Sequence, residues 1–335
     1  MATWSGILQE LSQTVPPQFD PIRRRYLRQY SEHVGRSTIL YATSFTQNKA
    51  ADPQIISIND EDVQGLMEVT QGLGGGTLDI ILHSPGGSID AVEGFVDYLR
   101  SRFDNIRVVV PHLAMSAATM ICCASDEIFM GKHSFLGPVD PQFFLPTSFG
   151  PRPVAAQALL DQFKKAMDDC ADPQKINGWI PILGQYGPDL LIKAENSLSL
   201  SRELVATWLQ KYMFAGEADA ETKGKEIAET LADHGLHKSH GRHFSRERVS
   251  DIGLKVNFLE ADEVMQDLAL SVFHATTHAF SMTPAIKIIE NQHGRAFLKT
   301  QQPQAQSPFM QPQFPFAPTP TFPQGPGPGM PQPPK

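Results

Sequence analysis

The chain has 335 residues with 36 acidic and 28 basic side chains, and its net charge of −8 argues against binding to nucleic acid, which requires a basic face. Hydrophobic residues make up 41% of the chain, enough for a large buried core, and the mean hydropathy of −0.23 disfavours an integral membrane protein. The three cysteines show neither a metal-binding nor a disulfide spacing, which predicts reduced thiols.

The first residues, MATWSGILQELSQTV, do not have the basic segment and the apolar stretch of a secretory signal peptide. The uncharged stretch 108–125 contains Pro111, His112 and Ser116 and is too polar and too interrupted to span lipid. We therefore expect a soluble cytoplasmic protein.

In chain order, the first segments predict two helices separated by apolar runs. Apolar residues at helical spacing favour a helix over 20–34. Apolar runs follow at 37–43 and 54–58. The second run precedes Asn59 and Asp60, which are frequent helix caps, and a helix over 61–72 should end at the Gly-rich stretch 72–76.

The middle of the chain alternates between strand and helix patterns. The runs LDIILH (78–83) and NIRVVV (105–110) indicate buried strands, with an amphipathic helix over 89–103 between them. A small apolar helix over 117–124 and a strand over 126–130 follow. Nearly continuous apolar strands alternating with helices are typical of a parallel sheet covered by helices, so we expect an α/β fold.

The second half is helical in pattern over 154–233, followed by a short motif at 241–254 and a helical segment over 260–281. The last 35 residues contain twelve Pro, eight Gln and no acidic residue, so they cannot bury enough apolar surface to fold. We expect a globular domain with helical extensions over residues 1–300 and a disordered Pro/Gln-rich tail over 301–335.

The first candidate loop, SPGGS (84–88), follows a predicted strand at the edge where parallel sheets bind ligands. Its Gly86-Gly87 pair exposes backbone N–H groups that can hold a phosphate or a developing oxyanion. A tight turn with a positive φ would give the same pattern. Neither this loop nor the Gly-rich stretch 72–76 completes a dinucleotide motif, and Gly131-Lys132 does not complete a nucleotide-phosphate motif.

The second candidate loop, AMSAA (114–118), places a serine between small residues where a strand meets a helix, as in a nucleophile elbow. Ser116 would project freely, and the Ala117 N–H group could join an oxyanion hole. A serine that merely caps a small-residue helix would give the same sequence. Together, the two loops on consecutive strand–helix units favour a nucleophilic site.

The stretch 78–142 resembles the serine dehydrogenase proteinase family, a group of Clp-fold serine peptidases related to signal peptide peptidase A and the Clp proteolytic subunit. The resemblance rests on SPGG, AMS, DEI, MGKHS and LGPVDPQ, and it extends to SHGRHFSRERVSDIGL (239–254). It implies a ClpP/crotonase-like spiral of ββα units around a parallel core sheet, usually assembled into rings, with neither a metal nor a cofactor.

By that resemblance Ser116 is the nucleophile. The Gly87 and Ala117 N–H groups form the oxyanion hole, and Gly86 and Ser88 contact the substrate. Clp-type subunits take their base, a histidine, from the following strand, but the corresponding stretch here, 137–141, has none. Asp140, within it, could orient a base or end a turn.

The general base therefore stays open between lysine and histidine. Signal peptide peptidase A uses a lysine, for which Lys164 and Lys165 are candidates, although two surface lysines would look the same. His240 lies in a segment with four histidines, and the family resemblance implies that this residue is adjacent to an active-site position. Histidine is the natural general base near neutral pH. The period-three spacing and the neighbouring cations of this segment disfavour a metal site.

We expect a serine endopeptidase that acts on protein or peptide substrates as a homo-oligomeric ring, without a nucleic-acid partner. An unfoldase or membrane partner is left open. The alternative is a crotonase-fold protein without peptidase activity, either an acyl-thioester enzyme or an oligomeric binding scaffold.

Overall fold

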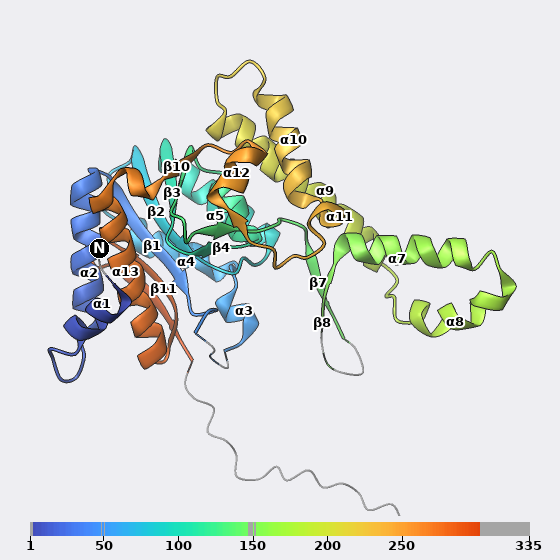
Figure 1. The fold of residues 1–335 in the computed structure, drawn as a ribbon, viewed down its shortest axis with the longest axis horizontal. Helices are drawn as coiled ribbons and strands as arrows, with labels where there is room; N and C mark the ends of the chain where they lie inside the picture. The colour runs from blue at the N-terminus through green and yellow to red at the C-terminus, as the bar shows by residue number, and fades with distance from the viewer. Residues whose placement is uncertain (1–2, 48, 50, 147–149, 151, 302–335) are drawn as a thin grey trace, which may run out of the picture. The chain divides into compact units, whose positions relative to one another are not determined.

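A seven-stranded sheet lies at the centre of the fold in the computed structural model, which describes residues 3–301 apart from 48, 50, 147–149 and 151 (Figure 1). The strand order is β10–β5–β3–β2–β1–β11–β12. Neighbours from β10 to β1 run parallel, whereas β11 is antiparallel to both β1 and β12. The strands are β1 (Ser37–Thr43), β2 (Thr77–His83), β3 (Asn105–Val110), β5 (Glu127–Met130), β10 (Val256–Phe258), β11 (Ala285–Asn291) and β12 (Ala296–Thr300). The predicted α/β fold with a parallel core sheet is confirmed.

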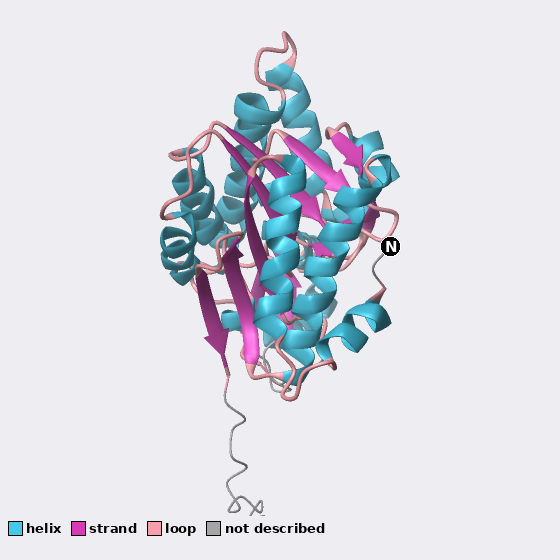
Figure 2. Cartoon of the chain, turned by 90° about the vertical axis from the view of Figure 1, so that its left-hand side faces the viewer, coloured by secondary structure: helices cyan, strands magenta, loops and turns pink. Residues whose placement is uncertain are grey.

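Helices cover both faces of this sheet because its central strands are apolar on both sides. Ile80 and Leu82 of β2 pack toward one helical layer, and Ile81 between them packs toward the other. The first layer is formed by α4 (Glu61–Thr70), α5 (Ile89–Arg100), α6 (Ala117–Cys123), the end of α9 (Leu190–Trp208) and α10 (Ala220–Ala232). The second layer is formed by α2 (Phe19–Val34) and α13 (Glu263–Met282), the long helices in front of the sheet in Figure 2.

Two antiparallel additions lie outside the predicted elements. The hairpin of β7 (Gln142–Leu145) and β8 (Arg152–Ala155) leads into an arm formed by α7 (Ala156–Asp169) and α8 (Pro173–Leu183) (Figure 1). Strands β11 and β12 complete one edge of the main sheet. All seven residues of β11 are buried although its sequence, AIKIIEN, contains Lys287 and Glu290, because both charges are paired inside the protein. These charges concealed a buried strand from the hydrophobic pattern.

The remaining short helices and strands lie outside the main sheet. The apolar run 54–58 forms a short helix and then an extended residue rather than a strand. A second, three-stranded sheet in the order β4–β6–β9 lies beside the main one. The strands of this second sheet are β4 (Leu113–Ala114), β6 (Phe135–Leu136) and β9 (Phe244–Ser245). The short helices are α1 (Trp4–Leu11), α3 (Pro53–Ile56), α11 (His234–His237) and α12 (Arg246–Ile252).

Residues 1–301 group into one unit, and residues 302–335 of the predicted tail lie outside the described residues. Within the described part of the chain, no helix is both long and apolar enough to cross a membrane.

Candidate active site

Three chain segments leave the sheets side by side around Ser116. Ser84 pairs with Ala114 in a parallel bridge, and β4 in turn pairs in parallel with β6 through Ala114 and Leu136. Parallel pairing sends the residues after each of these positions in the same direction. The SPGG and AMS loops, which are far apart in the sequence, therefore become neighbours, and the segment that follows β6 lies beside them.

Ser116 has the backbone conformation of a strained elbow. Its φ of 54° and ψ of −121° lie in a region that residues other than glycine rarely occupy. The Thr119 hydroxyl donates to the Ala114 carbonyl (2.8 Å) and accepts from the Gly137 N–H (3.0 Å), which ties the elbow to the segment after β6. The Ser116 side chain makes no capping hydrogen bond to α6, so it does not serve as a simple helix cap.

Gly86 allows the SPGG loop to approach this elbow. Its φ is +99°, and a Cβ atom at this position would lie 2.7 Å from the Ser116 Cβ and 2.6 Å from the Met115 carbonyl oxygen. Any larger residue would push Ser116 away from the loop. The positive φ of a tight turn and the close contact with the elbow are thus both present at Gly86.

Gly87 is held in a parallel bridge with Ile58. The Ile58 N–H donates to the Gly86 carbonyl (2.8 Å), and the Ser88 N–H donates to the Ile58 carbonyl (3.0 Å). In such a bridge the N–H and C=O groups of the central residue point away from the partner strand. The Gly87 N–H therefore points away from Ile58.

The other polar groups of this loop have internal partners. The Gly86 N–H donates to the Ser84 Oγ (3.2 Å), and the Ser88 Oγ accepts from the Ala91 N–H at the start of α5 (3.4 Å). The N–H of Ala117, the first residue of α6, has no intrahelical acceptor, because the first turn of a helix leaves its donors free. The N–H groups of Gly87 and Ala117 are therefore used neither by the bridge to Ile58 nor by the first turn of α6.

A buried carboxylate binds two imidazoles in the segment that follows β6. Asp140 is only 1% exposed, so it is not a surface turn residue. Its Oδ1 accepts from His240 Nδ1 (2.8 Å) and its Oδ2 from His234 Nδ1 (2.9 Å). When Nδ1 of a neutral histidine donates to a carboxylate, Nε2 carries a free lone pair and can accept a proton.

The pairing of β6 with β9 explains how His240 comes to Asp140. The antiparallel register joins Phe135 to Ser245 and Leu136 to Phe244, so the chain leaves β6 toward residue 140 at the same end at which it enters β9 from residue 240. The Asp140 segment is also fixed by its neighbour Val139. The Val139 carbonyl accepts from the Ser201 Oγ of α9 (2.9 Å), and its N–H donates to the Leu231 carbonyl of α10 (3.0 Å).

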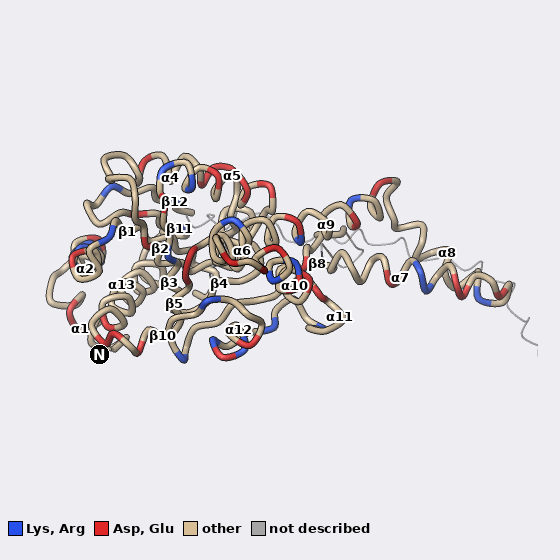
Figure 3. The backbone as a smooth tube through the Cα atoms, turned by 90° about the horizontal axis from the view of Figure 1, so that it is seen from above, with Lys and Arg blue, Asp and Glu red and all other residues tan. Residues whose placement is uncertain are grey.

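The lysine candidates lie elsewhere. Lys164 and Lys165 are exposed on α7, and Lys165 forms an ion pair with Asp169 one helical turn later (3.6 Å). Helix α7 belongs to the arm, away from β4 in both Figure 1 and Figure 3. The structure does not bring either lysine to Ser116. His234, which shares Asp140 with His240, was noted in the sequence only as part of a histidine-rich segment.

A further histidine lies at the end of β2, beside β4. His83 ends β2 and is fully buried against Phe45 and Phe273. Burial lowers the pKa of His83 to about 3, with a smaller contribution from His112. Its imidazole is therefore neutral at physiological pH.

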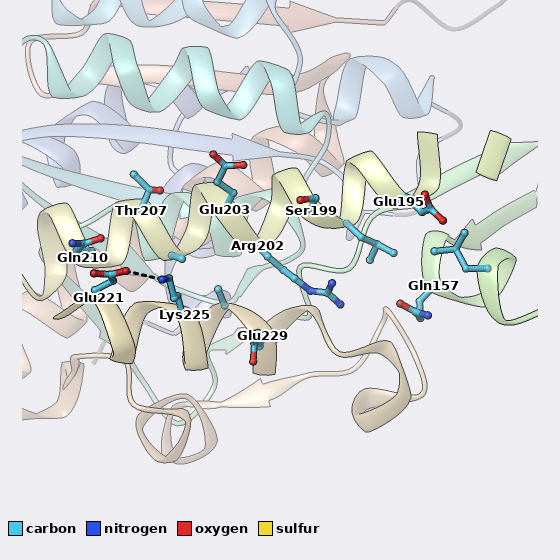
Figure 4. A pocket seen from close by; sticks show the side chains of 14 residues that line it. Gln157, Glu195, Ser199, Arg202, Glu203, Thr207, Gln210, Glu221, Lys225 and Glu229 are labelled. Carbon is cyan, nitrogen blue, oxygen red and sulfur yellow. Dashed lines mark hydrogen bonds and ion pairs between the residues drawn. The ribbon is translucent and has the colours of Figure 1, made fainter. Parts of the chain in front are cut away.

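A groove of about 550 Å³ lies between α7, α9 and α10 (Figure 4). Most of its lining residues are polar, with Arg202 extending from α9 toward α10 and an ion pair between Lys225 and Glu221 (2.6 Å). None of the lining residues belongs to the loops around Ser116. We therefore do not place the scissile bond in this groove.

Comparison with known proteins identifies the family. The family model of ClpP-like SDH-type serine proteinases matches residues 54–274, well over half of the chain, which confirms the family resemblance of the motifs. Two uncharacterized proteins of Methanocaldococcus jannaschii, MJ0137 and MJ1495, are 28% and 27% identical over 187 and 180 residues. The matches cover 56% and 54% of this chain and 56% and 52% of the relatives, so the chain spans about half the length of the curated relatives it matches.

Proposed function

The chain belongs to the ClpP-like SDH-type serine proteinase family, and on that premise we propose that it hydrolyses peptide bonds with Ser116 as the nucleophile. The observation behind this proposal is the strained backbone of Ser116 beside Gly86. Strain of this kind costs about 1–3 kcal/mol and persists only where the surrounding structure imposes it, which is common at catalytic residues. A serine with a structural role alone would not need this conformation.

In the proposed reaction, the Ser116 oxygen bonds to the carbonyl carbon of the substrate while its proton moves to His240 Nε2. The carbonyl π electrons move to the oxygen, and the Gly87 and Ala117 N–H groups donate to that oxyanion. Asp140 keeps the proton of His240 on Nδ1 and stabilises the imidazolium. The C–N bond then breaks, and His240 returns the proton to the leaving amine. A water molecule hydrolyses the acyl-enzyme by the same steps.

Replacement of Ser116 by Ala tests the nucleophile. Hydrolysis of casein should fall by at least about 10³-fold, and labelling by a fluorophosphonate should vanish, because the covalent route is lost. Stability should change by less than about 1 kcal/mol, since a single half-buried oxygen is removed. The matched control is Ser101→Ala, an exposed serine after α5, which should keep full activity. Near wild-type proteolysis by Ser116→Ala would exclude this nucleophile.

The two histidines on Asp140 allow a paired test of the base. His240→Gln should reproduce the loss seen in Ser116→Ala, whereas His234→Gln should keep most of the activity, because we assign the proton transfer to His240. Equal activity of His240→Gln and wild type would rule out His240 as the base. A wild-type protein with neither labelling nor hydrolysis would instead favour the crotonase-fold alternative without peptidase chemistry.

We also propose that the protein assembles into a homo-oligomer. Support comes from several large apolar side chains that are exposed on the arm and at the start of α9, since apolar side chains exposed together on one part of a protein often belong to an interface. These side chains are Met167, Ile176, Ile180 and Ile192.

A further inference from the structure

A buried ion pair lies directly behind the loop that contains Gly87. Lys287 of β11 and Asp62 of α4 are each about 1% exposed, and the Lys287 Nζ lies 2.6 Å and 2.8 Å from the two Asp62 carboxylate oxygens. Asp62 Oδ2 also accepts from the Tyr41 hydroxyl (2.7 Å). Burial lowers the pKa of Lys287, and the contact with Asp62 opposes this shift.

The pair binds the backbone on both sides of Ile58. The third N–H of Lys287 donates to the Ser57 carbonyl (2.8 Å), and Asp62 Oδ2 accepts from the Asn59 N–H (3.1 Å). In an extended segment, the Ser57 carbonyl and the Asn59 N–H point to the side opposite to the N–H and C=O groups of Ile58. The ion pair thus holds one edge of this short segment, and the Gly86–Ser88 loop pairs with the other edge.

We propose that Lys287 and Asp62 are positioning residues that fix the Gly87 N–H donor through Ile58. This inference rests on the proposed function, because Gly87 has a catalytic role only if Ser116 attacks a carbonyl. The chain of contacts runs from the ion pair to Ser57 and Asn59, then through Ile58 to the carbonyl of Gly86 and the N–H of Ser88.

Stability alone does not explain a pair of this kind. Two buried charges lose their hydration, and apolar residues of similar volume often stabilise a fold equally well or better. An apolar pair, however, offers neither an acceptor for the Asn59 N–H nor a donor for the Ser57 carbonyl. The pair therefore supplies directional hydrogen bonds to a segment that must hold a catalytic loop in place.

The test compares two conservative carboxylate-to-amide substitutions. Asp62→Asn weakens the pair behind the loop. Glu290→Gln is the matched control, because Glu290 is also buried on β11 and pairs with Arg23 of α2 (2.6 Å), without a bond to residues 57–59. If Asp62→Asn does not fold, the double variant Lys287→Met/Asp62→Leu replaces it, since removal of both charges avoids an unpaired one.

Two measurements distinguish positioning from a general loss of stability. Hydrogen exchange of peptides that contain residues 57–59 and 86–88 should become at least about tenfold faster in Asp62→Asn and should stay unchanged in Glu290→Gln. The kcat for a peptide oxoester should fall about 10- to 100-fold with little change in KM, because part of one oxyanion contact is lost. The ratio of oxoester to thionoester hydrolysis should fall as well, since sulfur uses the N–H donors poorly.

If Asp62→Asn and Glu290→Gln change exchange and kcat equally, the positioning role is refuted, and the peptidase proposal still stands provided that Ser116→Ala is inactive. If the wild type hydrolyses neither ester nor casein, the proposed function fails. Hydrogen exchange then still decides whether the ion pair holds the loop.

Discussion

Replacement of Gly87 by Ala should inactivate the protein through a defined collision. The added Cβ atom would lie 2.2 Å from the Ile58 carbonyl oxygen and 2.4 Å from the Ile58 nitrogen. Favourable contacts between such atoms need about 3.5 Å, so Ile58 or the loop must move by roughly 1 Å. Both atoms are backbone atoms, and no side-chain rotation can relieve the contact.

The cost can be worked out from the contacts that the movement breaks. The two hydrogen bonds of the bridge, from Ile58 to Gly86 and from Ser88 to Ile58, each contribute about 1 kcal/mol. Overpacking of a closely packed site adds about 1–3 kcal/mol. We therefore expect a destabilisation of about 3–5 kcal/mol. The displaced N–H donor should lower kcat by about 10²- to 10³-fold.

The assay combines thermal unfolding with steady-state kinetics on a peptide substrate. Gly94→Ala is the control, because Gly94 is exposed within α5 and the nearest atom to an added Cβ, the Val63 Cγ2, is 4.0 Å away. That change should raise stability by up to about 1 kcal/mol and leave kcat unaltered. A Gly87→Ala variant that folds normally and keeps kcat within about fivefold of wild type would refute the oxyanion assignment.

Three further predictions follow from burial and exposure. The pKa of His83, about 3 in the folded protein, is below the ordinary value near 6.5, so the unfolded state binds a proton first and stability falls as the pH drops below about 6.5. The loss in the free energy of unfolding should reach about 2 kcal/mol at pH 5. His83→Gln should therefore reduce the fall in Tm between pH 7 and pH 5, and the same fall in Tm as in the wild type would contradict this. The double variant Lys164→Ala/Lys165→Ala should keep wild-type kcat because both lysines are exposed on α7, and a loss above about tenfold would reinstate a lysine base. Light scattering should give a particle several times the 37.0 kDa chain mass, and a 37.0 kDa particle at micromolar concentration would exclude the oligomer.

The parallel core and the two loops around Ser116 could be predicted from local sequence patterns. Four of the seven residues of β2 and four of the six residues of β3 are aliphatic, and such runs are local, so they can be recognised without knowledge of the fold. The same holds for Gly86 and Ser116, because close approach of the backbone and a sharp turn place demands on residue type at the position itself.

The contacts between distant polar groups could not be predicted from such patterns. Asp140 and His240 are 100 residues apart, and they come together through the pairing of β6 with β9, a register that two-residue strands do not reveal in a sequence. Lys287 likewise made β11 look unlike a core strand, because its charge is tolerated only where Asp62 neutralises it. Hydrophobic periodicity reports the environment of each residue along one element, whereas a buried charge is stable only beside a partner that the packing of another element supplies.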